Sequence, residues 1–296
     1  ENVRRGESVK NSILSEGQET FLKLLSDVVK QQPSAAEVCL QKLETHLQKW
    51  SAGRHDAVVE AAYAAFAKEL PPVAQRYVQF ALARHWFNQV LRSHRQIMGN
   101  GFQVARALDE LSQKSLRQCY VLASSLGADD TLLAEVRTLR LQIVDHYLAL
   151  KFDDVAEAAV KVKAEPANSV LDEEAELELA GLKRRIAEQQ LARQLKQHDG
   201  RRQIVLTPAF NEAIASLKKF ITDHPTSERV PMAADGVFVI GRRFEQQQAW
   251  LVATGIYSDF EQFAAKIDAL KQARPEQLTY PEKAAMARAS ALHTRA

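Results

Sequence analysis

The sequence predicts an all-α protein whose antiparallel helical pairs stack as an α-solenoid. Strand signals are weak, because Val and Ile rarely alternate with polar residues outside the short stretch RRQIVLTP (Arg201–Pro208). Amphipathic segments of helix length recur along the chain, and short breaks containing Pro, Gly or capping residues separate them. About twelve helices are expected in sequence, and such a series indicates stacked pairs more than one closed bundle.

The first 128 residues are predicted to form five helices with clear end signals. The first spans about 8–31, and the capping box SAAE (Ser34–Glu37) opens a second that ends near Trp50. The third follows the loop SAGRHD and ends at two prolines. The fourth and fifth are expected over about 73–98 and 102–126, with the break GNG between them. The fourth is apolar over a wide arc, which predicts burial between neighbouring helices.

The rest of the chain is predicted to form seven helices with short connections. We expect them over about 131–150, 153–165, 169–197, 208–223, 230–246, 249–271 and 281–295. Short connections between helices of this length make successive helices antiparallel neighbours. The sequence therefore predicts an N-terminal helical region of divergent hairpins over 1–128 and a region of helical repeats over 129–296.

A recurring residue pattern defines these repeats. Ala213, Leu217, Phe220 and Pro225 follow one another at offsets of 4, 3 and 5. These are the spacings of the second helix of a tetratricopeptide repeat. The small residue lets two helices approach closely, the two apolar residues fill the seam, and the proline ends the helix. Pro225 is therefore predicted to end one repeat, with Thr226 or Ser227 capping the next helix and Pro231 in its first turn.

Two further copies of the pattern are present. In the stronger copy, Gly241 and Phe244 occupy the first-helix positions of the repeat. Ala253, Tyr257 and Phe260 occupy its second-helix positions. A weaker copy comprises Tyr147, Ala156, Val160 and Lys163. Its gap of nine residues between Tyr147 and Ala156 equals the gap between Phe244 and Ala253.

The stretches AIASLKKFITDHPTSERVPMA and IGRRFEQQQAWLVATGIYSDF resemble the repeats of bacterial envelope tetratricopeptide proteins of the BamD and YbgF (CpoB) type. The resemblance covers about residues 205–265 well, 131–166 weakly and 1–128 hardly at all. It implies a protein that binds other proteins, in the periplasm or cell envelope. Two features depart from the pattern: Ala213 and Ala253 are 40 residues apart, and QQQAW replaces the usual Gly-Asp/Glu-Tyr between the helices.

Composition excludes several classes of function. The 296 residues carry a formal net charge of +2, which does not favour nucleic acid as a partner. No run of apolar residues is long enough to predict a membrane span. The two cysteines, Cys39 and Cys119, are expected to be buried small hydrophobes, and a single bridge stays open for an oxidising compartment. Because the chain begins at Glu1 and not Met, we expect a processed or excised product, which leaves secretion open.

Motifs for catalysis, cofactors and metals are not recognised in the sequence. It contains no GxSxG, Walker or GxGxxG motif and no HExxH or zinc-type spacing. His85 and His94 lie on different faces of one helix, and the Cys39–His46 spacing is too long for a catalytic dyad. Paired carboxylates at 129–130 and 153–154 are interpreted as helix caps. We therefore predict a non-enzymatic protein with no cofactor and no metal.

The strongest candidate binding residues are basic. Arg185, Arg193 and Lys196 follow one stripe of the predicted helix over 169–197, and Arg242 and Arg243 lie on a nearby first helix. First helices line the concave face of tetratricopeptide folds, so these side chains are predicted to form a groove for an acidic peptide or carboxyl terminus. The alternative is an exposed helix whose acidic start and basic end suit its dipole.

Three interpretations of function follow. The first is a non-enzymatic scaffold or adaptor that binds another protein or peptide. The second is a structural spacer or oligomerisation domain cut from a larger protein, and the third is an all-α enzyme whose residues form no recognisable motif. A charged concave face would favour the first, bare apolar ends the second, and a deep pocket with ionisable groups the third.

Overall fold

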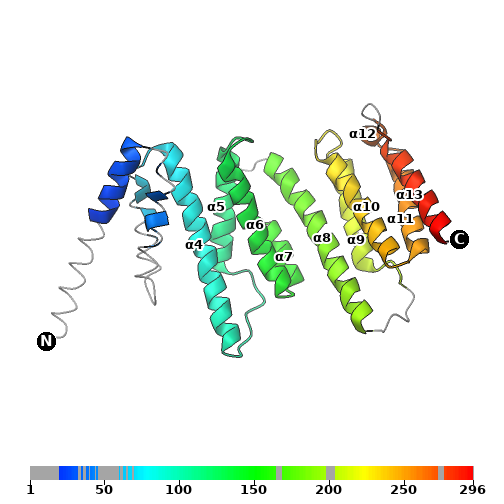
Figure 1. Cartoon of the computed structure of the whole chain (residues 1–296), viewed down its shortest axis with the longest axis horizontal. Helices are drawn as coiled ribbons and strands as arrows, with labels where there is room; N and C mark the ends of the chain where they lie inside the picture. The colour runs from blue at the N-terminus through cyan, green and yellow to red at the C-terminus, as the bar shows by residue number, and fades with distance from the viewer. Residues whose placement is uncertain are drawn as a thin grey trace. The chain divides into compact units, whose positions relative to one another are not determined.

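The structure, a computed structural model, is all-helical, which confirms the predicted fold class (Figure 1). It describes residues 20–32, 35, 38–39, 41–43, 45, 60, 63–64, 66–68, 70–164, 169–197, 204–272 and 277–295. Over these residues it contains no strand. The named helices are α4 (Pro72–Gly99), α5 (Glu110–Ser125), α6 (Thr131–Ala149), α7 (Asp153–Val160), α8 (Ser169–Gln197), α9 (Pro208–Asp223), α10 (Val230–Gln246), α11 (Trp250–Ala264), α12 (Asp268–Lys271) and α13 (Tyr280–Arg295).

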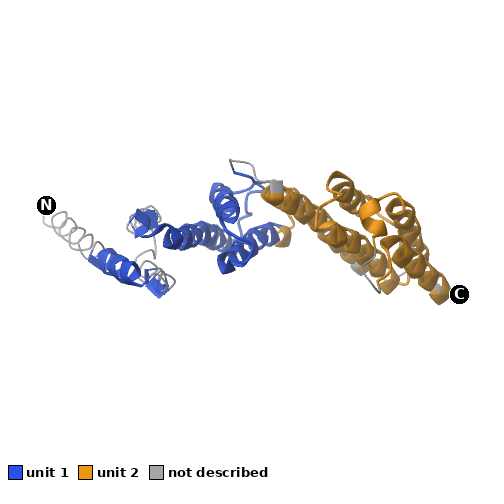
Figure 2. Cartoon of the chain, turned by 90° about the horizontal axis from the view of Figure 1, so that it is seen from above, with its two compact units in different colours: residues 1–147, 162–166 blue, residues 148–161, 167–296 orange. Residues whose placement is uncertain are grey.

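The chain forms two compact units (Figure 2). Unit 1 comprises residues 1–147 and 162–166, and unit 2 comprises residues 148–161 and 167–296. The predicted division after residue 128 separated divergent hairpins from regular repeats, and it stays a prediction. No helix in the described part of the chain has the length and apolarity that crossing a lipid bilayer would require.

In unit 1, α4 packs against α5. The prolines before α4 explain where it begins: Pro71 is extended and Pro72 lies in the first turn, where a missing N–H costs little. The predicted burial of this helix is confirmed at Val78, Phe87 and Val90, which are all nearly inaccessible. The two prolines thus set the residue at which this apolar helix begins.

The fifth predicted helix begins later than expected. Residues 102–109 are not helical, and α5 starts only at Glu110. The hydroxyl of Tyr147 accepts a hydrogen bond from the backbone N–H of Asp109 at 3.2 Å and donates one to its carboxylate. Asp109 is thereby held extended, with a ψ of 144°, and cannot continue a helix backwards. We call residues 102–109 the α4–α5 segment.

The C-terminal helices follow the prediction with two differences. Helices α8, α9 and α10 have the predicted bounds. The helix expected over 153–165 ends at Val160, and the one expected over 249–271 is divided into α11 and the short α12. In unit 2, α9 packs on α8, α10 on α9, α11 on α10 and α13 on α11. This sequential packing is that of stacked helical pairs.

The seam between α10 and α11 depends on a glycine. A Cβ atom built on Gly241 would lie 2.3 Å from a ring carbon of Tyr257, well inside contact distance. The two helices can therefore approach as they do only because Gly241 has no side chain. Tyr257 is almost fully buried, and burial raises the pKa of its hydroxyl, as does the neighbouring Glu245. The Gly–Tyr pair of the predicted repeat is thus a direct contact.

The turns inside two helical pairs are alike. Lys151, between α6 and α7, and Gln248, between α10 and α11, are the two non-glycine residues with positive φ among the described residues, at 63° and 58°. Each donates its N–H to the carbonyl three residues earlier. Lys151 stands four residues after Tyr147 and five before Ala156, and Gln248 has the same position between Phe244 and Ala253. The weak sequence copy therefore has the same turn conformation as the strong one.

Candidate functional site

The predicted basic residues of α10 differ in exposure. Arg242 is exposed, whereas Arg243 is half-buried. Arg243 donates from Nη1 to Oε1 of Gln246 at 3.3 Å. Its Nε is buried, and within the described part of the chain it has no hydrogen-bond partner. Of the two, Arg242 is the side chain that a partner can reach without rearrangement.

The predicted basic residues of α8 are less accessible than the sequence suggested. Arg185 and Arg193 are both half-buried, and Arg193 donates to Gln189 of its own helix at 3.2 Å. The side chain of Lys196 lies outside the described residues. Helix α8 packs chiefly on α9 and touches α10 over a shorter stretch. The structure thus puts the four described arginines on two touching helices of one unit, with Arg242 the most open.

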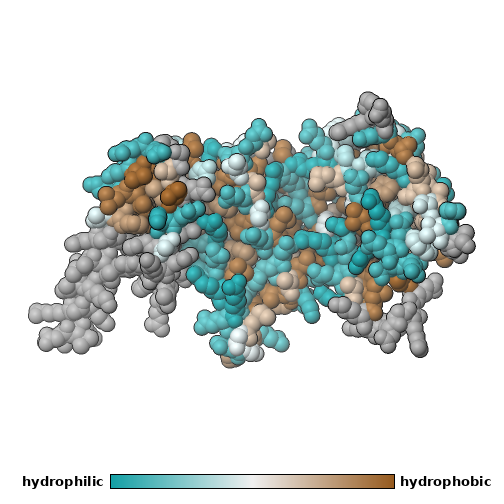
Figure 3. All heavy atoms as spheres, in the orientation of Figure 1, coloured by the Kyte–Doolittle hydropathy of each residue, from teal (hydrophilic) through white to brown (hydrophobic). Residues whose placement is uncertain are grey.

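Helix α10 presents one exposed row of side chains, which we call the α10 outer row. Its members recur every three or four residues and are Met232, Asp235, Val239, Arg242 and Gln246. Met232 is 64% exposed. The hydroxyl of Tyr280, on α13, donates to the backbone carbonyl of Pro231 and lies 3.2 Å from Asp235 Oδ1, so α13 borders the start of the row. On the face drawn in Figure 3, apolar residues are likewise interspersed among hydrophilic ones.

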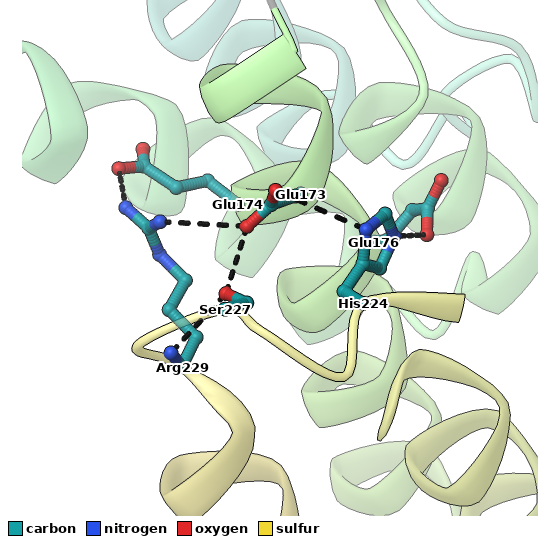
Figure 4. A network of polar contacts seen from close by, with 6 residues as sticks. All are labelled: Glu173, Glu174, Glu176, His224, Ser227 and Arg229. Carbon is teal, nitrogen blue, oxygen red and sulfur yellow. Dashed lines mark hydrogen bonds and ion pairs between the residues drawn. The ribbon is translucent and has the colours of Figure 1, made fainter. Parts of the chain in front are cut away.

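The acidic start of α8 has a specific role that its helix dipole does not explain. Three glutamates of α8 contact the segment between α9 and α10 (Figure 4). His224 Nε2 lies 2.8 Å from Glu176 Oε2, Ser227 Oγ donates to Glu173 at 2.8 Å, and Arg229 pairs with Glu174. We call these six side chains the joint network: Glu173, Glu174, Glu176, His224, Ser227 and Arg229.

The joint network corrects the expected capping of α10. The N-cap position is Arg229 and carries no side-chain cap, so neither Thr226 nor Ser227 caps the helix. Ser227 Oγ instead accepts the N–H of Arg229 at 3.2 Å while donating to Glu173. Pro231 does lie in the first turn, as predicted. The residues between α9 and α10 therefore attach this joint to the start of α8.

A buried polar cluster in unit 1 was missed from the sequence. Two histidine rings face each other, with His94 Nδ1 2.8 Å from His146 Nε2. The other nitrogen of His94, Nε2, lies 3.2 Å from the carboxylate of Asp109. Tyr147 donates to that carboxylate and lies 3.0 Å from Ser112 Oγ. We call His94, Asp109, Ser112, His146 and Tyr147 the histidine cluster.

The environment of the histidine cluster favours neutral side chains. His94, Ser112 and Tyr147 are almost fully buried. Burial lowers the pKa of His146, the nearby His94 and Arg95 lower it further, and Asp109 opposes them. Burial and then Asp109 raise the pKa of the Tyr147 hydroxyl. The cluster therefore contains a carboxylate, two imidazoles and a phenol, and burial disfavours the charged form of His146.

The cluster is a hydrogen-bonded set with its nitrogens directed at one another. Over the residues that the structure describes, no group of three or more His, Cys, Asp or Glu side chains is arranged to hold a metal ion. His94 was compared only with His85 in the sequence, whereas its partner is His146, 52 residues later. No local spacing signals such a contact, because α4 and α6 meet only in the folded unit.

Both cysteines are buried and free, as their interpretation as small hydrophobes predicted. Burial raises the pKa of Cys119 to about 12 and also raises the pKa of Cys39. Neither thiol is a reactive thiolate at neutral pH, since the thiolate is the nucleophilic form. His46, which the sequence paired with Cys39, lies outside the described residues.

Comparison of the chain with known proteins gives no match: no family model, curated protein or solved structure is similar to it. The likeness of residues 205–265 to envelope tetratricopeptide repeats therefore stays a prediction based on their residue pattern. A function has to be argued from the contacts and exposed side chains of the two units.

Proposed function

We propose that the protein is a non-enzymatic interaction scaffold built from tetratricopeptide-like repeats, which binds an acidic segment of another protein on the α10 outer row. The observation that carries this proposal is the exposure of Arg242 on a helix that is otherwise packed against α9 and α11. Such a helix is rigid, so an arginine on its open face offers a pre-organised donor to a carboxylate.

The polar chemistry of the row supports an acidic peptide. Arg242 presents a planar fork of N–H donors suited to carboxylates, and the half-buried Arg243 lies next to it. Met232 and Val239 add exposed apolar surface on the same face, at 64% and 40%. A peptide with a carboxylate near Arg242 and a small apolar residue one or two turns away would fit this arrangement. The resemblance of residues 205–265 points to the periplasm or cell envelope as the compartment.

Binding to a panel of carboxylate-rich peptides of varied sequence tests the proposal. We expect Arg242→Glu to weaken binding of the best peptide by about tenfold or more, since a charge-assisted hydrogen bond contributes about 1.5–3 kcal/mol. Lys266→Glu is the matched control, because Lys266 is exposed in the turn after α11 and its replacement changes the charge equally. Both variants should keep the helicity and melting temperature of the parent chain.

Equal weakening by both variants would show that general charge and not the row is responsible, and would contradict the proposal.

A spacer role is the second candidate. It is favoured by ion pairs that link helices of unit 2 without using α10: Lys183–Glu212 at 2.5 Å, Lys218–Asp259 at 2.5 Å and Arg288–Glu261 at 3.1 Å. Such links stiffen an array without creating a binding face. Failure of every peptide to bind would leave the spacer as the better explanation.

A further inference from the structure

We propose that His94 and His146 form an acid-sensitive latch that holds the α4–α5 segment onto unit 1. The latch has two consecutive contacts: His146 Nε2 to His94 Nδ1 at 2.8 Å, and His94 Nε2 to Asp109 Oδ2 at 3.2 Å. Asp109 is the last residue of the segment, so the second contact holds the segment through the carboxylate of that residue. This inference concerns unit 1 and is independent of the proposed binding surface on α10.

Counting protons shows why acid opens the latch. Two nitrogens 2.8 Å apart share one hydrogen, which either ring can donate. When both rings are neutral, His94 donates from Nε2 to Asp109 and accepts at Nδ1 from His146. One added proton is tolerated, because a charged His94 donates from both nitrogens. A second proton places hydrogens on both facing nitrogens and two positive charges side by side, so the rings must separate.

Of the charged and titratable groups that face His146, two disfavour its charged form and one favours it. From α4, His94 and Arg95 disfavour its charged form, and the ring of Phe87 packs edge-on at 5.8 Å. From the α4–α5 segment, the carboxylate of Asp109 favours the charge. On α6 itself, the hydroxyl of Tyr147 has a raised pKa, and its ring packs edge-on against the His146 ring with the two ring centroids 5.4 Å apart. One carboxylate can stabilise one imidazolium but not two.

The sign of the pH dependence follows from linkage. The pKa of His146 is lower in the folded unit than in an unfolded chain, where imidazole titrates near about 6.5. The closed latch is therefore fully stable above that value and loses stability as the pH falls through the folded pKa.

Most of the α4–α5 segment is exposed, and near its end Gln113 donates from Nε2 to the carbonyl of Leu108 at 3.2 Å. Phe102 is 71% exposed, and Gln103, Ala105, Arg106 and Ala107 are also exposed. At its beginning, Phe102 N–H bonds to the carbonyl of Ile97 at 3.1 Å, and at its end Asp109 is held by Tyr147 and His94. Opening the latch would remove His94 from the contacts that hold the end of the segment and would loosen that end and the first turn of α5, while Tyr147 stays bonded to Asp109 and the cores of both helices stay packed.

Amide hydrogen exchange of the full chain, resolved by residue with NMR and corrected for intrinsic rates, tests the latch. We expect the protection of the Asp109 amide to fall by about tenfold or more between about pH 7.5 and about pH 5. The amide of Tyr120, in the buried part of α5, should stay protected, which separates local opening from unfolding. In His146→Gln, which cannot gain a charge, the pH dependence should disappear. His85→Gln, the matched control on α4, should keep it, because His85 bonds to Gln89 and not to Asp109.

Two results would overturn the proposal. One is a parent chain whose Asp109 protection does not change with pH, and the other is a His146→Gln variant with the same pH dependence as the parent. If His146→Gln does not fold, imidazole nitrogen shifts of the parent chain decide. The latch requires that the second protonation of the His94–His146 pair coincides with loss of protection at Asp109. Protonation of both rings without that loss would refute it.

Discussion

The two units build their interiors from different residues. Six of the seven buried polar or charged residues that the structure describes belong to unit 1: Ser26, Gln89, His94, Ser112, Ser115 and Arg140. Unit 2 contributes only Glu174 to this set, whereas both units bury aromatic side chains, such as Phe66 and Phe87 in unit 1 and Phe210 and Phe244 in unit 2. Both units therefore pack by shape, and unit 1 adds more buried polar contacts that specify how its helices meet.

This difference teaches how each unit should fail. An aromatic seam is sensitive to added or removed volume and indifferent to pH. A buried polar contact is sensitive to loss of one partner, because the other is then left unsatisfied away from water. Substitutions at one glycine and at two polar contacts can separate these kinds of failure.

The largest effect is expected for Gly241→Ala in unit 2. The new Cβ would lie 2.3 Å from the Tyr257 ring, so α10 and α11 must move apart or the ring must leave its position. Overpacking of this kind costs about 1–3 kcal/mol, and we expect the upper end because the ring is buried. Gly255→Ala is the control, since no neighbouring atom lies within 4 Å of its Cβ position. Denaturant unfolding that shows equal stability for both variants would contradict the importance of shape in this seam.

A smaller effect is expected for Arg229→Ala, which breaks an ion pair with Glu174, the one buried charged side chain among the described residues of unit 2. The side chain of Glu174 is 8% exposed and that of Arg229 is 25% exposed, so solvent screens the pair only in part. We expect a loss of about 1–2 kcal/mol, because Glu174 keeps its burial but loses its ion-pair partner. Glu176→Gln, at a 48% exposed side chain of the same network, should change stability far less. Thermal melts of the two variants check the order, and the reverse order would be inconsistent with it.

The smallest effect is expected in unit 1, for Ser115→Ala. The buried hydroxyl of Ser115 donates to the carbonyl of Ala83 at 2.8 Å and so links α5 to α4. We expect a loss of about 1 kcal/mol, the usual net value of one hydrogen bond. Ser124→Ala should have almost no effect, since that exposed hydroxyl bonds within its own helix to Val121. The difference between the two variants in a urea titration isolates the contact between helices. A difference near zero would argue that directed polar contacts do not stabilise unit 1.

The same contrast explains how much of the fold the sequence could predict. The bounds of α9 and α10 follow from local spacing, because prolines, small residues and aromatic residues act within one or two turns. The repeat positions of Gly241 and Tyr257 were predicted as well, whereas their contact is a finding of the structure. The α4–α5 segment was predicted as helix because its residues are compatible with one. In the structure Asp109 is bonded to Tyr147, 38 residues later, and lies next to His94, and no local pattern contains that information.

The candidate sites were predicted less completely for the same reason. The arginines of α10 could be identified, because charge and helical phase are local properties. The glutamates at the start of α8 were interpreted through the helix dipole, whereas Glu173 and Glu174 contact Arg229, on a segment more than 50 residues later. The histidine cluster needed α4 and α6 to be packed before His94 and His146 could be recognised as a pair.

The turns at Lys151 and Gln248 have a consequence for engineering. Both residues adopt a left-handed backbone that glycine accepts freely and a branched side chain resists, at a cost of about 1 kcal/mol for an ordinary residue. At Gln248 the N–H of the following Ala249 also returns to the carbonyl of Phe244 at 2.9 Å, which completes the helix-ending motif that glycine usually occupies. At these two turns the backbone therefore has the conformation that glycine favours, although the residues are Lys151 and Gln248. A designer who wanted a regular, extendable array could begin at these two positions, where the backbone already has the form that the consensus residue favours.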